Sequence, residues 1–247
     1  MTLSKALKTM LWINADDVGR TCAETDAALR CVRRGRLTSV SAMVFMDDSE
    51  RAAELLRDEG IPVGIHVNFT EAFSAPAVPA SVSASQSRVR PFLASHKYAM
   101  LIYNPFLRKD FRVLYEYQCE EFMRLYQREP MHVDGHEHMH LCTNMLASGL
   151  IRQGQRVRRQ QSFWPDQGRL LNRTYRGLID QFLVRQYETV DHFLELAHYV
   201  EGSRMVKVAE LARTNTVEVM AHPAMPAEYS YLMSDDFGQL LKGLTAR

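Results

Sequence analysis

Short apolar runs and amphipathic segments alternate from the start of this chain, and this order restricts the fold more than any other feature. Strands are expected at residues 10–14, 39–45 and 62–67, with helices at 23–34 and 49–59 between them. Ser49 is expected to cap the second helix. Such alternation is typical of parallel strands joined by crossover helices, an architecture in which ligands bind at the carboxyl ends of the strands.

The same order continues through the second half of the chain. A long amphipathic helix is expected at 110–127, followed by a strand that opens a histidine-rich stretch. Further helices are expected at 144–153, 169–186 and 205–213, and strands at 156–159 and 216–220. Counting gives about six or seven strand–helix units, which favours a closed or nearly closed barrel over an open sheet.

Residues 72–90 interrupt this order. The stretch is rich in alanine, serine and proline, and Pro76 and Pro79 break regular structure near its start. Loops of this length usually bind ligands, cover active sites or are disordered. We therefore expect a lid loop within residues 72–95, with plain disorder as the alternative.

Composition narrows the choice of partners. The 247 residues include 30 lysines and arginines against 29 aspartates and glutamates, so net charge gives no long-range attraction to nucleic acid. A small, mostly uncharged substrate fits better. The first apolar run, residues 10–13, is too short for a membrane span or a signal peptide, so a cytoplasmic protein is expected. The four cysteines form no CxxC pair and are expected as buried free thiols.

Residues 132–140 contain the densest group of metal-binding side chains. Five fall on even positions and would share one face of a strand: His132, Asp134, His136, His138 and His140. An extended chain advances about 3.3 Å per residue, so His136 and His140 would lie about 13 Å apart, too far for one ion. If the strand ends near His136, that residue is the best single ligand, and His140 returns or orients the loop. His132 and Asp134 are expected deeper, as hydrogen-bonding partners.

Two adjacent carboxylates, Asp16 and Asp17, close the first expected strand. Where the chain turns, both can reach one cleft, so that one binds a metal and the other takes up a proton. On its own, such a pair is more often a turn or helix-cap signal. His66 and His222 end two later expected strands, and the alternatives are a core histidine for His66 and a loop histidine without a role for His222.

One aspartate and two histidines, with open positions for water, are a common way to hold a catalytic divalent ion. The ligands here would be Asp17, His66 and His136. The ion would lower the pKa of bound water to about 7, while Asp16 accepts a proton and a histidine protonates the leaving group. Such a site hydrolyses an amide or an ester. The mixed ligands suit one Mg or Zn ion, and also admit Mn or Co.

Five motifs occur in the order typical of a known family. They are residues 14–19 (NADDVG), Arg34-Gly35 with Leu37-Thr38-Ser39, residues 64–71 (GIHVNFTE), residues 132–140 (HVDGHEHMH) and His222-Pro223. In these motifs the chain resembles the YdjC-like carbohydrate deacetylases, the family of chitooligosaccharide deacetylase and of the hopanoid-biosynthesis protein HpnK. Four positions depart from the family pattern: Val18, Gly135, Glu137 and Ala224. None of these four positions is an expected metal ligand. The resemblance therefore predicts metal binding more closely than it predicts the identity of the substrate.

The resemblance implies an α/β fold, a distorted (β/α) TIM-like barrel forming a single domain over residues 1–247. It implies a divalent ion on the three expected ligands and removal of an N-acetyl group from an amino sugar or an acetylated glycan or glycolipid. Likeness to the wider polysaccharide deacetylases implies that Asp16 is the base and His222 the acid. Further expected residues are Asn68, Glu71 and Arg158 for substrate binding, and Asp134, His138 and His140 for support of the ligands.

Several alternatives stay open. A metallohydrolase of the amidohydrolase or phosphoesterase type would use HxH pairs, which occur within 132–140, but those families place the pair on the first strand, where this chain has Asp16 and Asp17. A non-catalytic metal- or sugar-binding module would not require Asp16 or His222. Arg158 could equally position Asp16 or form a plain salt bridge. A homodimer is one option for the oligomeric state.

Overall fold

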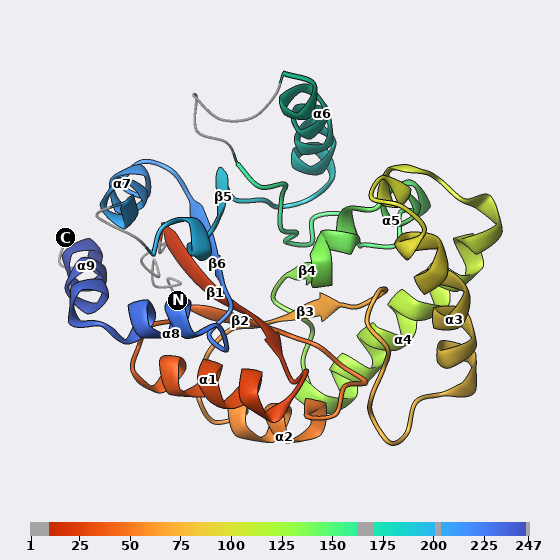
Figure 1. The fold of residues 1–247 in the computed structure, drawn as a ribbon, viewed down its shortest axis with the longest axis horizontal. Helices are drawn as coiled ribbons and strands as arrows, with labels where there is room; N and C mark the ends of the chain where they lie inside the picture. The colour runs from red at the N-terminus through yellow and green to blue at the C-terminus, as the bar shows by residue number, and fades with distance from the viewer. Residues whose placement is uncertain (1–9, 163–169, 201–203, 246–247) are drawn as a thin grey trace, which may run out of the picture.

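Six parallel strands form one curled sheet, with helices packed around it (Figure 1). The computed structural model describes residues 10–162, 170–200 and 204–245. In chain order the strands are β1 (Leu11–Val18), β2 (Ser39–Ala42), β3 (Val63–Val67), β4 (Val133–Gly135), β5 (His192–Glu195) and β6 (Val217–Ala221). Their order in space is β4-β3-β2-β1-β6-β5. The carboxyl ends of all six strands therefore lie at one end of the sheet, where the residues that follow them can meet.

Helices follow most strands and cover the sheet. The α-helices are α1 (Cys22–Arg33), α2 (Ser49–Leu56), α3 (Ala80–Ala94), α4 (Arg108–Tyr126), α5 (Thr143–Ser148), α6 (Leu170–Gln186), α7 (Arg204–Leu211), α8 (Pro226–Met233) and α9 (Asp235–Thr245). Short 3-10 helices are η1 (Ala99–Leu101), η2 (Pro105–Leu107), η3 (His136–Leu141) and η4 (Leu196–His198). In Figure 1, α1, α2 and α4 lie below the sheet. Residues of β2, β3 and β6 are buried along their whole length, as in sheets covered on both faces.

The inside of the curled sheet is unusually polar. Alternate residues of neighbouring strands place there Asn14, Asp16, Ser39, Ser41, His66, His132, Asp134 and Glu218, all buried. The glycine at position 64 makes room for them, since a Cβ atom there would lie 2.2 Å from Nε2 of His132. This polar interior leads directly to the carboxyl ends of the strands and supports the residues that project there.

The edges of the sheet approach each other through residues 155–162. Val157 forms an isolated bridge to Val133 of β4, and Arg156 forms one to Glu188, shortly before β5. The Ser162 amide donates to the carbonyl of Phe193 in β5, at 2.8 Å. The α/β prediction is confirmed in this form, a parallel sheet that curls into a half-barrel. The strand expected at 156–159 is reduced to these bridges, and the described residues do not form the eight strands of a complete TIM barrel.

The expectation of an irregular loop over residues 72–95 is wrong for most of its length, because α3 occupies residues 80–94. Buried residues at helical spacing, Val82, Val89 and Leu93 among them, pack this helix against the core. Gln86 fixes its approach by donating to the Glu71 carbonyl at 2.8 Å. Pro79 is the cap residue at the start of the helix and Pro76 precedes it, so neither of them breaks the helix.

Smaller differences concern helix and strand ends. Asp48, not Ser49, is the cap residue of α2; the Ser49 hydroxyl instead donates to the Met43 carbonyl at 3.0 Å. The strand β1 runs four residues beyond its expected end, and the sequence patterns did not predict β5, α8 or α9. All four cysteines are free, as expected, but of these Cys22 is exposed and Cys119 is half-buried, contrary to the expectation of burial. Among the described residues, no helix has the length and apolarity needed to cross a membrane.

Candidate active site

The end of β1 directs both of its carboxylates to one place. Asp17 has a left-handed backbone (φ 62°), and the register with β2 shifts between Ala15 and Val18. The chain then turns at Gly19 (φ 87°), where a Cβ atom would lie 2.9 Å from the Met43 carbonyl oxygen. Because of this irregularity, adjacent residues need not point to opposite faces. Asp16 and Asp17 consequently line the same cleft, of about 360 Å³.

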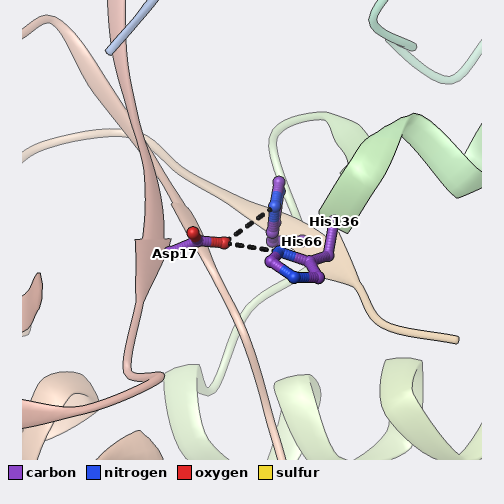
Figure 2. A group of neighbouring side chains, drawn as sticks. All are labelled: Asp17, His66 and His136. Carbon is purple, nitrogen blue, oxygen red and sulfur yellow. Dashed lines mark hydrogen bonds and ion pairs between the residues drawn. The ribbon is translucent and has the colours of Figure 1, made fainter. Parts of the chain in front are cut away.

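Asp17, His66 and His136 converge at the carboxyl ends of β1, β3 and β4 (Figure 2). His136 Nδ1 lies 2.9 Å and His66 Nε2 3.2 Å from the same carboxylate oxygen, Oδ1 of Asp17. One nitrogen or oxygen atom from each side chain lies within 4.8 Å of the others. This is the set expected from the sequence as metal ligands, and its geometry can hold one cation.

The strand ends immediately before His136, close to where the sequence predicted its end. β4 stops at Gly135, and the chain enters η3, where Glu137 and His138 both have left-handed backbones (φ 52° and 59°). A side chain at Gly135 would lie 3.0 Å from the His140 amide and from Val67. The tight turn therefore points His136 at Asp17 and carries the later histidines away from it.

Asp134 orients His66 from behind. Its Oδ1 lies 2.8 Å from His66 Nδ1, which leaves Nε2 facing Asp17. Burial alone would lower the pKa of His66, but the carboxylates of Asp134 and Asp16 raise it to about 10. Burial likewise opposes ionisation of Asp17, yet hydrogen bonds with His136 and His66 hold its pKa well below the usual range. The metal-free site therefore favours a protonated His66 between ionised carboxylates.

Arg158 fills the interior beside Asp16. Its guanidinium donates to both carboxylate oxygens of Asp16, at 2.6 and 2.7 Å, and contacts Asp134 at 2.7 Å and Glu218 at 2.7 Å. Burial would raise the pKa of Asp16, but the Arg158 charge lowers it. The Arg158 side chain has no exposed area, so this guanidinium positions Asp16 and does not face a substrate. Sequence reasoning missed Glu218, whose alternation with apolar neighbours in β6 was the available signal.

The remaining polar residues of the 132–140 stretch stabilise the surroundings. His132 Nε2 lies 2.8 Å from the Ser41 hydroxyl. His140 Nε2 lies 3.0 Å from the Arg158 carbonyl, and burial lowers the pKa of His140 to about 3. His138 turns toward Glu195, with Nε2 3.6 Å from Oε1. Asp134 contacts a candidate ligand directly, and His140 reaches only the backbone of Arg158.

His222 lies on the wall of the cleft that also contains Asp16. It follows β6, and its amide donates to Oε2 of Glu228 at 2.8 Å, while Nδ1 lies 3.9 Å from Oε1. Burial raises the pKa of Glu228. Glu228 was not expected from the sequence, because α8 was not predicted. It fixes the position of His222 and places a carboxyl group beside its ring.

The two polar residues Asn68 and Glu71, in the loop after β3, have different roles. Asn68 is buried and accepts hydrogen bonds from the amides of Thr70 and Glu71, so it shapes the loop and does not reach the cleft. Glu71 lies 3.3 Å from His136 Nε2 and pairs with Arg20 at 2.9 Å. Arg20, which the sequence did not single out, borders two clefts. One is the cleft that contains Asp16 and His222, and the other is lined by Glu71, His136 and residues of α3.

Comparison with known proteins shows the family and the fold of the chain. The family model described as YdjC-like protein matches residues 10–243. A carbohydrate deacetylase of Mus musculus is 28% identical over 256 residues, covering 89% of this chain and 79% of the relative. A chitooligosaccharide deacetylase of Citrobacter koseri is 29% identical over 138 residues, covering 55% of this chain and 52% of the relative. The crystal structure of an Enterococcus faecalis protein, named as a candidate cellobiose-phosphate cleavage protein, shares the fold (TM-score 0.66, 19% identity, 95% and 94% coverage).

Proposed function

Because the chain belongs to the YdjC-like protein family, whose relatives include carbohydrate deacetylases, we propose that it is a metal-dependent hydrolase of N-acetylated amino sugars. One observation carries the proposal. The candidate ligands Asp17, His66 and His136 adjoin a cleft that also presents Asp16 and His222, a carboxylate and an imidazole able to move protons. The sugar can be a free amino sugar or part of a glycan or glycolipid.

The three candidate ligands suit a divalent ion by the chemistry of their donor atoms. Asp17 offers a carboxylate oxygen, and the two histidines offer one ring nitrogen each. His66 is held at its other nitrogen by Asp134, the arrangement common behind metal-bound histidines. When bound, a Mg, Zn, Mn or Co ion supplies a Lewis acid for the acetyl carbonyl and lowers the pKa of water.

Asp16 accepts the proton of the attacking water in this proposal. Arg158 keeps the Asp16 carboxylate ionised and fixes its orientation, which secures the proton-accepting form but also makes it a weaker base. His222 gives a proton to the amine that leaves, and Glu228 holds the His222 backbone in place. Acetate and a free amino sugar are the products.

A hydrolase that uses an HxH metal pair is not favoured by these contacts. Such a pair needs two ring nitrogens, two residues apart, directed at one ion. His138 is directed at Glu195, and His140 at the Arg158 carbonyl, so neither joins His136 beside Asp17.

Acetate release tests the proposal. The protein, treated with a chelator, is assayed on N-acetylglucosamine, its oligomers and other N-acetylated sugars, before and after addition of Mg, Zn, Mn or Co. We expect acetate only after an ion is restored. If an ion binds and no substrate yields metal-dependent acetate, the protein is a binding module and the proposal fails.

A further inference from the structure

The segment from residue 72 to residue 109 contains no acidic residue, although the chain has 29 in 247 positions. It comprises α3, η1, η2 and the start of α4. Within it lie five basic residues: Arg88, Arg90, Lys97, Arg108 and Lys109. A protein with almost no net charge therefore has one strongly biased region, which the proposed reaction does not explain.

The end of this region also exposes large apolar side chains. Residues 97–109, here called the amphiphilic segment, contain five of the twelve large apolar residues that are exposed in the described parts of the chain. They are Tyr98, Leu101, Ile102, Tyr103 and Phe106. Phe106 is 90% exposed. Such a concentration within nine residues is typical of a surface that contacts another apolar phase or molecule.

Buried residues and hydrogen bonds fix the backbone of the amphiphilic segment, so its apolar side chains remain exposed. Ala99 and Leu107 are buried and fix η1 and η2 to the body of the protein. Between them, the Asn104 amide donates to the Asn144 side chain at 2.9 Å, and Asn144 donates back to the Asn104 carbonyl at 2.8 Å. In Figure 1 this part of the chain lies at the right, next to α3 and α5. The anchors hold the apolar side chains outward.

The charges of the amphiphilic segment indicate what it contacts. Lys97, Arg108 and Lys109 are exposed, and among the described ion pairs none joins them to a carboxylate. Lys97 Nζ lies 4.9 Å from the centre of the Tyr98 ring. Basic residues beside tyrosine, phenylalanine and aliphatic side chains are the combination that binds the headgroup region of anionic lipids. A second copy of this chain would instead bring like charges together.

We propose that the amphiphilic segment docks the protein peripherally on an anionic lipid surface. The apolar side chains enter the interfacial region, and the three basic residues contact the lipid headgroups. The wider of the two clefts is lined by Arg90, Leu93 and Ala94 of α3, directly before this segment, and by His136. Docking therefore places a mouth of the candidate active site close to the lipid surface. The inference does not depend on the proposed reaction.

Vesicle co-sedimentation of the whole protein tests this docking. We expect binding to phosphatidylcholine vesicles that contain phosphatidylglycerol, weaker binding to phosphatidylcholine alone, and loss of binding as salt rises. Ile102→Ser combined with Phe106→Ser should lower the partition coefficient about tenfold or more, since two large apolar side chains no longer insert. Leu178→Ser with Val184→Ser, on exposed positions of α6, is the matched control and should bind as the wild type.

Three outcomes would overturn the docking proposal. The first is the absence of binding to anionic vesicles. The second is equal binding by the Ile102/Phe106 variant, with its thermal unfolding unchanged from wild type. The third is a dimer in solution, measured by light scattering without lipid, that the same variant dissociates. That result would assign the amphiphilic segment to an interface between copies.

Discussion

Two groups of ligating side chains share His66 but differ in what balances their negative charge. The outer group, Asp17 with His66 and His136, adjoins the clefts, and its guanidinium partner is the partly exposed Arg20, 3.4 Å from Asp17. The inner group, Asp16 with His66 and Asp134, is fully buried and is bound by the guanidinium of Arg158. Each could hold a cation by its donor atoms alone.

The difference shows how neighbouring carboxylates can be given separate tasks. A buried carboxylate needs a permanent partner, and Arg158 provides one to Asp16, Asp134 and Glu218 at once. The outer group can then accept an exchangeable ion, while the inner group keeps Asp16 ionised and oriented. Variants of each group should therefore fail in different ways.

The largest expected effect separates ligand from base. His66→Ala should abolish both metal binding and turnover, because it removes one of the three proposed ligands. Asp16→Asn should keep the ion and lower kcat by about 10²–10⁴-fold, the usual contribution of a general base. Metal content by atomic spectroscopy and acetate release measure the two effects, with His96→Ala, an exposed histidine, as the control. Equal metal loss in His66→Ala and Asp16→Asn would contradict this division.

The inner group should matter most for stability. Arg158→Met leaves three buried carboxylates without their cation and should lower the free energy of unfolding by about 3–5 kcal/mol. Arg152→Met is the matched control, since Arg152 forms an exposed pair with Glu129 and should cost less than about 1 kcal/mol. Urea unfolding of the metal-free proteins measures both. If both variants lose a similar free energy of unfolding, the buried ion pairs of Arg158 stabilise the fold no more than an exposed pair does.

Proton release should accompany metal binding to the outer group. The pKa of His66 is raised to about 10, so at neutral pH the metal-free protein carries a proton that an ion must displace. Affinity should therefore fall about tenfold for each pH unit between about 9 and 6, instead of only below pH 6 as free histidines would give. Calorimetry in buffers of different ionisation enthalpy counts the protons. A release of zero protons at pH 7.5 would show that His66 is already neutral.

The same shift has a consequence for the metal-free protein's stability. A group with a raised pKa in the folded state stabilises the fold below its ordinary value, 6.5 for His66. That contribution is lost as the pH rises toward 10. The carboxylates act in the opposite direction: the lowered pKa values of Asp17 and Asp134 contribute stability that is lost as the pH falls below the ordinary value of 3.8.

Sequence patterns predicted the outer group better than the inner one. Asp17, His66 and His136 lie at or just beyond the ends of expected strands, and the distance that an extended chain would span indicated that His136 and His140 could not both bind one ion. The burial of Arg158 and its contact with Glu218 depend on the curl of the sheet, which places residues 158 and 218 face to face. No local periodicity encodes that approach. The helix α3 was missed because its alanine- and serine-rich sequence has little amphipathic character, although alanine itself favours helices.

The smallest expected effect concerns Glu228. Glu228→Gln keeps an acceptor for the His222 amide but removes the negative charge 3.9 Å from His222 Nδ1. A carboxylate there attracts the positively charged imidazole that the proposed acid step requires, and a glutamine amide does not. We expect kcat to fall about tenfold or less on the alkaline side of its pH profile, with metal affinity unchanged. A uniform loss at all pH values, with the alkaline limb in place, would limit Glu228 to holding the backbone.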